Sequence, residues 1–312
     1  MKYNFSNIKK AKLILDKKDC VAIPTETVYG LAANAYSSKA VKKIFKLKKR
    51  PNHNPLIVHY YNLNDLKKDC EINSDFNKLF KKFSPGPITY ILKLKKNSKI
   101  SPIVTNKMNT LAVRFPKHFM TRKLLKLLNY PLAAPSANIS TRVSPVCSQD
   151  VKDDFGKKIK FVLDGGRSSI GLESTIVSLI DKPKILRLGG LMTTDIVKIL
   201  KKDLRFLVNP SKISAPGQMN LHYSPGIPIR LNVKKPKKNE AYLLIKKNNK
   251  FKENTFYLSK NSNLKEAAKN LYITLRKIKK HNFKSIAVEK IKKQGFGKTI
   301  NDRLLRAAKF SR

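Results

Sequence analysis

Short apolar runs alternate with helical patterns from Cys20 onward, and this alternation restricts the chain to a fold in which helices cover a sheet. Residues 20–23 are expected to form a buried strand. Ser37 or Ser38 is then expected to cap a helix whose apolar side chains recur on one side, namely Ala40, Val41, Ile44, Phe45 and Leu47. Further strands are predicted at 55–61, 89–94, 110–115, 131–137, 160–164 and 174–180. The pattern predicts an α/β fold with a mixed, twisted sheet.

A proline-rich segment divides the chain. Four prolines lie between Asn209 and Pro228, and they exclude a helix or a central strand there. Beyond this segment, strands are predicted at 241–246, 255–259 and 285–290, with a helix over 264–278 before the last strand. Thr299 is expected to cap a final helix. The sequence therefore predicts three parts: a larger domain at 1–205, a Pro/Gly-rich linker at 206–229, and a small Rossmann-like α/β domain at 230–312.

The composition is strongly basic but not that of a disordered chain. Its 312 residues include 67 Lys and Arg against 20 Asp and Glu, a formal charge of +47, and 41% of them are apolar. Because the cations are spread along the whole length, they indicate either a lysine-rich solvated surface or a surface that binds polyanions. The three cysteines are far apart and indicate reduced thiols. With no signal-like or membrane-spanning apolar run, we expect a cytoplasmic protein without membrane contact.

Two segments bring polar side chains next to predicted strands. PTETVYGL (24–31) places hydroxyls, a carboxylate and a glycine directly after a strand, where open α/β sheets bind ligands. The alternative is an ordinary strand-to-helix loop with a threonine cap. In KKRPNHNPLIVH (48–59), cations end a helix and two prolines fix the loop that carries Arg50 and Asn54. These cations suit a polyphosphate, although cations at a helix end also favour the helix macrodipole.

Three later segments are rich in small and polar residues: APSANIS (134–140), the DGG and GLESTI stretch (164–176), and LRLG (186–189). Each lets a ligand approach the backbone, yet each alone is compatible with a plain turn.

The sequence lacks the motifs of several other kinds of functional site. The histidines and cysteines show no zinc-ligand spacing, and neither a GxSxG elbow nor a GxGxxG dinucleotide motif occurs. GKT at 297–299 lacks the preceding glycine of a P-loop, because Lys292 stands there.

In chain order, the segments PTETVYGL, KKRPNHNPLIVH, SPGPITYIL, TLAVRFP, APSANIS, DGG with ESTIV, and LRLGG resemble the YrdC-like family. Together with APGQMNLHYSPGIPI (215–229) and the small second domain, they resemble the long, two-domain form of that family. The resemblance implies a positively charged cavity in a YrdC-like domain. It also implies a nucleotidyltransferase that condenses L-threonine, bicarbonate and ATP to threonylcarbamoyl-AMP and pyrophosphate, the first step of threonylcarbamoyladenosine formation next to the tRNA anticodon.

The resemblance further implies residue roles. The positions that match threonine contacts are Thr27, His59, Arg114 and Ser174, with the Arg114 fork on the threonine carboxylate. The positions that match contacts to ATP or the adenylate are Lys48, Arg50, Asn54, Thr110, Ser136, Asn138, Ser144, Arg187 and Tyr223. Catalysis is expected from Lys48, Arg50, Ser136 and Asn138, and Tyr223 would make the 206–229 linker a lid. Mg²⁺ is expected to arrive with ATP, without a metal bound by the protein itself.

Two departures from the family pattern stand out: Lys49 replaces a usually small residue, and Ser140-Thr141 replaces a Ser-Gly pair. The downstream partner implied is the machinery that transfers threonylcarbamoyl to tRNA, with possible weak RNA contact. Two other functions remain open, an RNA-binding module that uses the basic cavity without catalysis and a carbamoyltransfer enzyme with another acceptor. The complete set of threonine positions and the HYSP segment of the linker favour the synthase.

Overall fold

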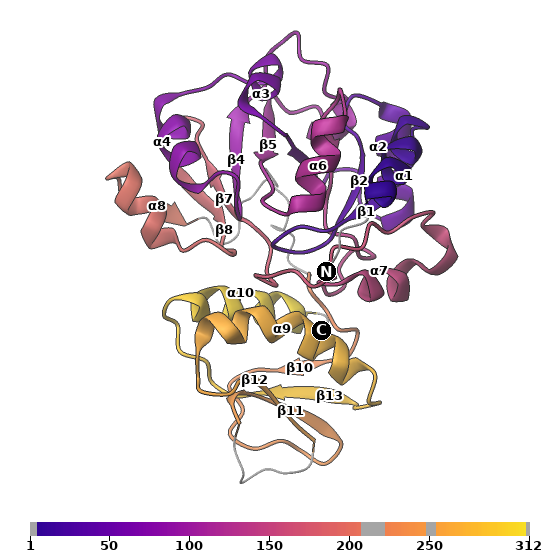
Figure 1. Ribbon diagram of the computed structural model, residues 1–312. Helices are drawn as coiled ribbons and strands as arrows, with labels where there is room; N and C mark the ends of the chain where they lie inside the picture. Colours follow the sequence, from indigo (N-terminus) through magenta and orange to yellow (C-terminus); the bar gives the residue numbers. More distant parts are fainter. Residues whose placement is uncertain (1–4, 207–221, 248–253, 310–312) are drawn as a thin grey trace. The chain divides into compact units, whose positions relative to one another are not determined.

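The computed structural model describes residues 5–206, 222–247 and 254–309 (Figure 1). The chain forms two compact units. The first contains residues 1–140, 145–168 and 173–218, and the second contains residues 141–144, 169–172 and 219–312. Two short loops from the N-terminal part of the chain therefore belong to the second unit. In the described part of the chain, no helix is long and apolar enough to cross a membrane.

The described residues of the first unit form a nine-stranded mixed sheet. Its strands, in spatial order, are β1 (Val21–Ile23), β2 (Gly30–Asn34), β6 (Leu132–Ala133), β3 (Ile57–His59), β5 (Thr110–Arg114), β4 (Ile88–Lys93), β7 (Thr175–Ser178), β8 (Lys184–Arg187) and β9 (Arg205–Phe206). The pairs β3–β5 and β4–β7 are parallel, whereas β4 and β5 are antiparallel. The carboxyl ends of β3 and β5 therefore lie at the same edge as the amino ends of β4 and β7.

Helices pack on this sheet (Figure 1). They are α1 (Phe5–Asp16), α2 (Ser38–Lys48), α3 (Leu63–Asp69), α4 (Ser74–Phe83), α5 (Pro102–Thr105), α6 (Phe119–Leu127), α7 (Ser148–Phe155) and α8 (Thr193–Leu200), with a 3₁₀ turn at Gly156–Lys158. Helix α2 begins as predicted, because the Ser37 side chain accepts a hydrogen bond from the Ala40 amide. The buried side of α2 carries Ala40, Val41, Ile44 and Phe45.

The two faces of the central strands differ in character. Alternate side chains such as Val58, Val113 and Tyr90 belong to the large core of the unit. The opposite face carries a small apolar cluster of Ile57, Ile91, Ala112, Ile176 and Leu186. A third cluster joins α1 and α6 to β1, β2 and β6. The face with the small cluster is the one on which polar side chains gather.

The second unit contains a four-stranded parallel sheet within the described residues. Its order is β10 (Ile229–Arg230), β13 (Ser285–Val288), β11 (Glu240–Lys246) and β12 (Thr255–Ser259). Helices α9 (Leu264–Lys279) and α10 (Phe296–Ala308) complete this unit. The mixed sheet with helices and the small parallel α/β unit confirm the fold class expected from the sequence.

Three local predictions were wrong. Residues 160–164 form no strand, and Val162 makes only a single bridge to Ala22. The segment after β1 does not lead directly into a helix, because β2 intervenes and pairs with β1. Helix α10 begins at Phe296 after Gly295, so Thr299 lies inside the helix and does not cap it. Most of the linker predicted at 206–229 falls in residues 207–221, outside the described residues.

Candidate active site

His59 and Arg114 lie opposite each other at the ends of two neighbouring parallel strands, β3 and β5. Because side chains alternate along a strand, His59 shares a face with Ile57, and Arg114 shares a face with Ala112. Ile57 and Ala112 both belong to the small apolar cluster. Thr110 is half-buried at the start of β5, four positions before Arg114, and its side chain lies on the same face of the sheet. An imidazole and a guanidinium thus project from one sheet face among apolar neighbours.

Arg114 is held by a protein carboxylate. Its Nη2 donates to Oε1 of Glu26 at 2.7 Å, and its Nε donates to the carbonyl of Gly86 at 3.4 Å. The second carboxylate oxygen of Glu26 accepts a hydrogen bond from the Lys117 amide at 2.9 Å. Glu26 comes from the loop after β1, so this ion pair joins PTETVYGL to the end of β5.

The imidazole of His59 is buried, and neither of its nitrogens makes a hydrogen bond of normal geometry among the described residues. The Leu132 backbone is near enough to the ring to raise the pKa of His59, but this is the smallest of the three effects on it. Burial, and next the charge of Arg114, lower the pKa of His59 well below its ordinary value. The ring is therefore neutral at pH 7 and offers one N–H donor and one acceptor. A buried polar group without a protein partner is typical of a side chain that awaits a ligand.

Ser174 and Arg187 form a second polar group at the same edge of the sheet. Arg187 donates from Nε and Nη2 to the Ser174 carbonyl at 3.1 and 3.0 Å, and from Nη2 to the Ser174 hydroxyl at 3.1 Å. That hydroxyl also lies 2.7 Å from Oγ1 of Thr89 on β4. Thr89 is a buried member of this group that the sequence analysis missed.

The loop between β1 and β2 is organised by its own hydroxyls. Oγ1 of Thr25 accepts hydrogen bonds from the amides of Thr27 and Val28 and lies 2.8 Å from Oγ1 of Thr27. The hydroxyl of Tyr29 donates to the Gly166 carbonyl at 2.7 Å and accepts from the Gly165 amide at 3.1 Å. The PTETVYGL and DGG segments are therefore one connected structure. The alternative of a threonine-capped strand-to-helix loop is wrong.

Lys48 ties α2 to the APSANIS segment. Its buried ammonium donates to the backbone carbonyls of Ser136 and Asn138, and its own carbonyl accepts a hydrogen bond from the Ser140 amide at 2.8 Å. Burial, and next the charge of Arg50, lower the pKa of Lys48 well below its ordinary value. The lysine that the sequence analysis expected on the phosphates therefore also fixes the path of the loop that carries Ser136 and Asn138.

Arg50 is oriented by the rigid loop predicted around it. Its Nε donates to the carbonyl of Asn54 at 3.1 Å, and its Nη2 donates to the carbonyl of Pro55 at 2.9 Å. Arg50 and Asn54 are both buried. The described contacts thus bring together three predicted groups: Arg50 with Asn54, Lys48 with Ser136 and Asn138, and Arg187 with Ser174.

Ser144 and Tyr223 belong to the second unit and are described with it. Both are fully buried. The Tyr223 ring stacks on Tyr272 with centroids 5.9 Å apart, and the Arg303 guanidinium lies 4.6 Å from the centre of the Tyr223 ring. Tyr223 also has a left-handed backbone, with φ of 65°. Its side chain is therefore held by α9 and α10.

Sequence reasoning also missed the partner of Arg114. The local motif identifies Glu26 only as a carboxylate in a loop, and 88 positions separate it from Arg114 along the chain. The sequence did contain a signal of this pair: Glu26 follows a buried strand, and a carboxylate that is itself buried needs a cation beside it.

The described residues contain no group of three or more His, Cys, Asp or Glu side chains that could hold a metal ion.

The chain is similar to known proteins over nearly its whole length. The Sua5/YciO/YrdC family model, described as telomere recombination, matches residues 13–189. A second model, described as the threonylcarbamoyl-AMP synthase C-terminal domain, matches residues 190–309. The chain is 35% identical to the threonylcarbamoyl-AMP synthase of Pyrococcus abyssi, over 92% of this chain and 90% of that protein. It is 33% identical to that of Bacillus subtilis, over 98% of this chain and 94% of that protein.

A solved structure supports the same relationship. The crystal structure of P. abyssi Sua5 complexed with L-threonine is similar to this chain with a TM-score of 0.89 and 33% sequence identity. The match covers 97% of this chain and 94% of that one. The resemblance inferred from the sequence motifs is confirmed, and the chain belongs to the threonylcarbamoyl-AMP synthase family in its two-domain form.

Proposed function

We propose that this protein is a threonylcarbamoyl-AMP synthase, which converts L-threonine, bicarbonate and ATP to threonylcarbamoyl-AMP, pyrophosphate and water. The observation that carries the proposal is the buried Arg114 beside the unpartnered His59, on the sheet face that also presents Ser174. A buried fork of N–H donors matches an amino acid carboxylate. The relative from P. abyssi, crystallised with L-threonine, makes threonine the amino acid of choice.

Threonine is placed by four residues in this proposal. The Arg114 guanidinium binds the carboxylate, and the neutral His59 ring supplies a hydrogen-bond acceptor to the substrate. The hydroxyls of Thr27 and Ser174 complete the pocket. Both hydroxyls already lie in hydrogen-bonded groups, with Thr25 and with Thr89, so the protein holds them in place before threonine arrives.

ATP is placed by cations, hydroxyls and amides. These are Lys48, Arg50, Asn54, Thr110, Ser136, Asn138, Ser144, Arg187 and Tyr223. The cations among them neutralise the charge that develops on the leaving pyrophosphate. Magnesium is proposed to enter with ATP, bound through the phosphates, and it supplies further charge neutralisation there. Bicarbonate is the third substrate.

The chemistry needs no protein nucleophile. The threonine amine attacks the carbon of bicarbonate, water leaves, and a carbamate forms. A carbamate oxygen then attacks the α-phosphorus of ATP, and the bond to pyrophosphate breaks. Lys48, Arg50, Ser136 and Asn138 contribute by positioning and by electrostatic stabilisation.

The product is a reactive mixed anhydride. We propose that it is passed in the cytoplasm to enzymes that transfer threonylcarbamoyl to the tRNA adenosine next to the anticodon. The proposed catalytic domain is 1–205, with 230–312 as a C-terminal domain. Segment 206–229 joins them.

Pyrophosphate release by the purified protein tests the proposal. With ATP and magnesium present, release is expected only when both L-threonine and bicarbonate are added. Arg114→Ala is expected to lower kcat/KM for threonine by about 100-fold, since hydrogen bonds between charged groups contribute about 1.5–3 kcal/mol each. Circular dichroism and ATP binding check that the variant is folded. Release that does not depend on threonine would contradict the proposal.

A further inference from the structure

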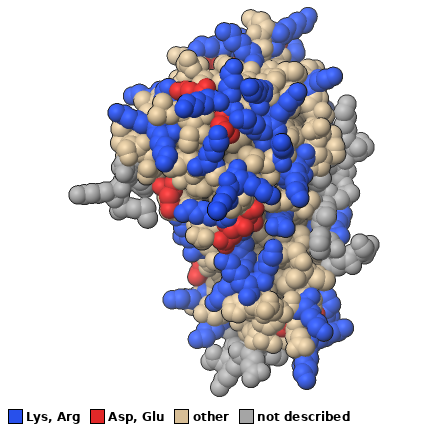
Figure 2. All heavy atoms as spheres, turned by 90° about the vertical axis from the view of Figure 1, so that its right-hand side faces the viewer, with Lys and Arg blue, Asp and Glu red and all other residues tan. Residues whose placement is uncertain are grey.

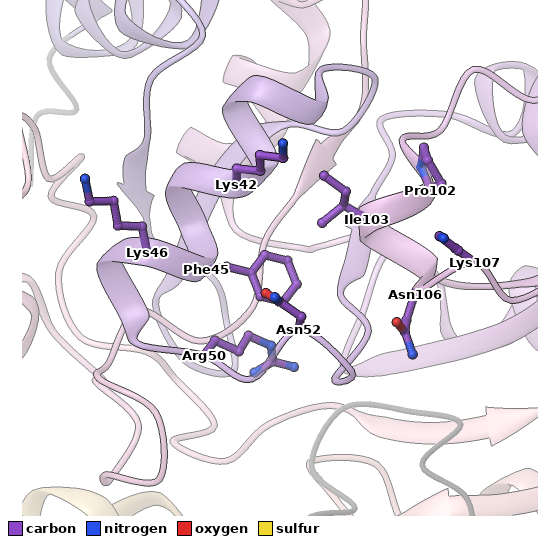
Figure 3. A pocket seen from close by; sticks show the side chains of 9 residues that line it. All are labelled: Lys42, Phe45, Lys46, Arg50, Asn52, Pro102, Ile103, Asn106 and Lys107. Atoms are coloured by element: carbon purple, nitrogen blue, oxygen red, sulfur yellow. The ribbon is translucent and has the colours of Figure 1, made fainter.

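A cavity lies in the first unit between α2 and α5, apart from the residues proposed to bind threonine (Figure 3). Its volume is about 570 Å³, which is enough for a nucleotide. The residues that line it are Lys42, Phe45, Lys46, Arg50, Asn52, Pro102, Ile103, Asn106 and Lys107. The lining therefore includes four cations and no carboxylate.

The lysines of this cavity have no charge partner. Lys42, Lys46 and Lys107 are exposed and make no hydrogen bond or ion pair through their side chains within the described part of the chain. By contrast, the neighbouring Lys43 on α2 pairs with Asp19 at 3.2 Å. Lys42 and Lys46 are also four residues apart on one helix face, an arrangement of like charges that destabilises a helix. Bound anionic groups would relieve this repulsion.

The helix macrodipole does not account for the whole cluster. A cation in the last turn of α2, such as Lys46, is favoured by the negative end of the helix dipole. Lys42 lies more than a turn before that end, and Lys107 follows α5 on the other side of the cavity (Figure 3). Cationic residues from separate elements therefore line one cavity.

The cavity also has features that phosphate alone does not require. The Phe45 ring and Ile103 lie between the lysines, and Asn52 also lines the cavity (Figure 3). Phe45 is only 6% exposed, and with the half-buried Ile103 it gives the cavity an apolar floor that a nucleobase can contact. The amides of Asn52 and Asn106 can each donate and accept hydrogen bonds at a base edge.

We propose that this cavity binds a nucleotide, with the base against Phe45 and Ile103 and the phosphate among Lys42, Lys46 and Lys107. Arg50, which is also proposed to contact ATP, lines this cavity, but none of the four residues proposed to bind threonine does. The inference does not depend on the proposed synthase activity. The nucleotide can come from an RNA strand or be free in solution, and the two sources are distinguished by experiment.

The test compares two matched charge reversals. Lys42→Glu with Lys46→Glu changes the cavity, whereas Lys78→Glu with Lys82→Glu makes the same change, at the same spacing, on the exposed surface of α4. The control is needed because Lys and Arg are abundant on the face shown in Figure 2, outside this cavity as well. Binding of a fluorescent single-stranded RNA and of fluorescent AMP is measured at several salt concentrations, together with threonine-dependent pyrophosphate release.

If the site takes RNA, the cavity variant binds the RNA at least tenfold more weakly than the control variant. The slope of the logarithm of its RNA-binding constant against the logarithm of salt concentration also becomes shallower by about 1.4. This is the change expected when two phosphate contacts to a single-stranded nucleic acid are lost, at about 0.7 each. If the site takes a free nucleotide, AMP affinity falls by a similar factor in the cavity variant alone. In either case pyrophosphate release and the KM for ATP are unchanged.

Equal loss of binding in both variants, or no loss in either, would show that the cavity is not a nucleotide site. A raised KM for ATP in the cavity variant would show that the cavity is only part of the ATP site. Pyrophosphate release by the wild type tests the synthase proposal separately from RNA and AMP binding, so failure of that proposal is distinguishable from failure of this one.

Discussion

The guanidinium of Arg114 and the carboxylate of Glu26 lie 2.7 Å apart, and their side chains are only 5% and 7% exposed. Two charges so deeply buried must compensate each other, because either one alone would be costly to desolvate. The positive charge proposed to bind threonine is therefore stabilised before the substrate arrives. Threonine adds a second carboxylate to this arrangement.

Glu26→Gln keeps the shape of the side chain but leaves Arg114 without a buried counter-charge. We expect the free energy of unfolding to fall by about 3–5 kcal/mol, as for other buried pairs from which one partner is removed. A bound threonine carboxylate replaces the missing charge. L-Threonine is therefore expected to raise the melting temperature of this variant more than that of the wild type.

Differential scanning fluorimetry with and without L-threonine measures both effects. Glu71→Gln is a suitable control, since Glu71 forms an exposed ion pair with Lys93, which contributes at most about 1 kcal/mol. If threonine raised the melting temperature of the wild type and of Glu26→Gln by the same amount, Arg114 would not be the carboxylate site.

Lys48→Met is expected to destabilise the protein and to loosen the segment 134–140. The carbonyls of Ser136 and Asn138 lose the ammonium that they share, and an unsatisfied buried carbonyl costs about 1–3 kcal/mol. Urea unfolding measures the loss of stability. Faster hydrogen exchange at the Ser140 amide, which is bound to the Lys48 carbonyl, would report the local effect. An unchanged free energy of unfolding would show that the Lys48 ammonium does not stabilise the segment 134–140.

His59 makes stability depend on pH. Its pKa in the folded protein lies well below the ordinary value of 6.5, mainly because of burial. Below about pH 6.5 the unfolded chain therefore binds a proton that the native state does not, and stability falls as the pH falls towards the folded-state pKa. His118, whose pKa is also lowered by burial, acts in the same direction.

Replacement of His59 by Gln is expected to flatten the dependence of unfolding free energy on pH between 7 and 5. The difference in slope approaches one proton, or about 1.4 kcal/mol per pH unit. Chemical denaturation at a series of pH values measures it, and His281→Gln, at an exposed position, serves as the control. Parallel curves for wild type and His59→Gln would mean that His59 titrates normally in the folded state.

Gly189 allows the segment after β8 to pass close to the start of β7. A Cβ atom at this position would lie 2.4 Å from backbone atoms of Glu173, Ser174 and Thr175. We expect Gly189→Ala to cost at least about 3 kcal/mol and to displace Ser174 from Arg187, with loss of threonine-dependent turnover. At Gly30 the tightest contact would be 3.3 Å, so Gly30→Ala is expected to be milder. Equal stability of the two variants would contradict the packing argument.

Strong apolar periodicity made most of the first sheet predictable, and weak periodicity concealed the rest. The strands at 57–59, 88–93 and 110–114 consist largely of β-branched or large apolar residues. Strand β2 has the sequence GLAAN, whose glycine and alanines do not favour a strand, so it was not predicted. Helix α10 begins among glycines that suggest a loop. Its Gly297 is needed there because a Cβ atom would lie 2.0 Å from the carbonyl of Lys292.

The site was predictable as a set of segments but not as a set of contacts. The resemblance carried by the motif order proposes Arg114, Arg187 and Lys48 as site residues. Their partners are distant in sequence: Glu26 lies 88 positions from Arg114, and the carbonyl of Ser136 lies 88 positions from Lys48. Only the fold brings these pairs together.

The most direct test of the synthase proposal follows a labelled carbon. The protein is incubated with ATP, magnesium, L-threonine and ¹³C-bicarbonate, and the products are analysed immediately by mass spectrometry. The account predicts one species that contains AMP, threonine and the ¹³C atom, formed in equal amount with pyrophosphate before it decays. Formation of AMP or ADP without a species that joins threonine and the labelled carbon would contradict it.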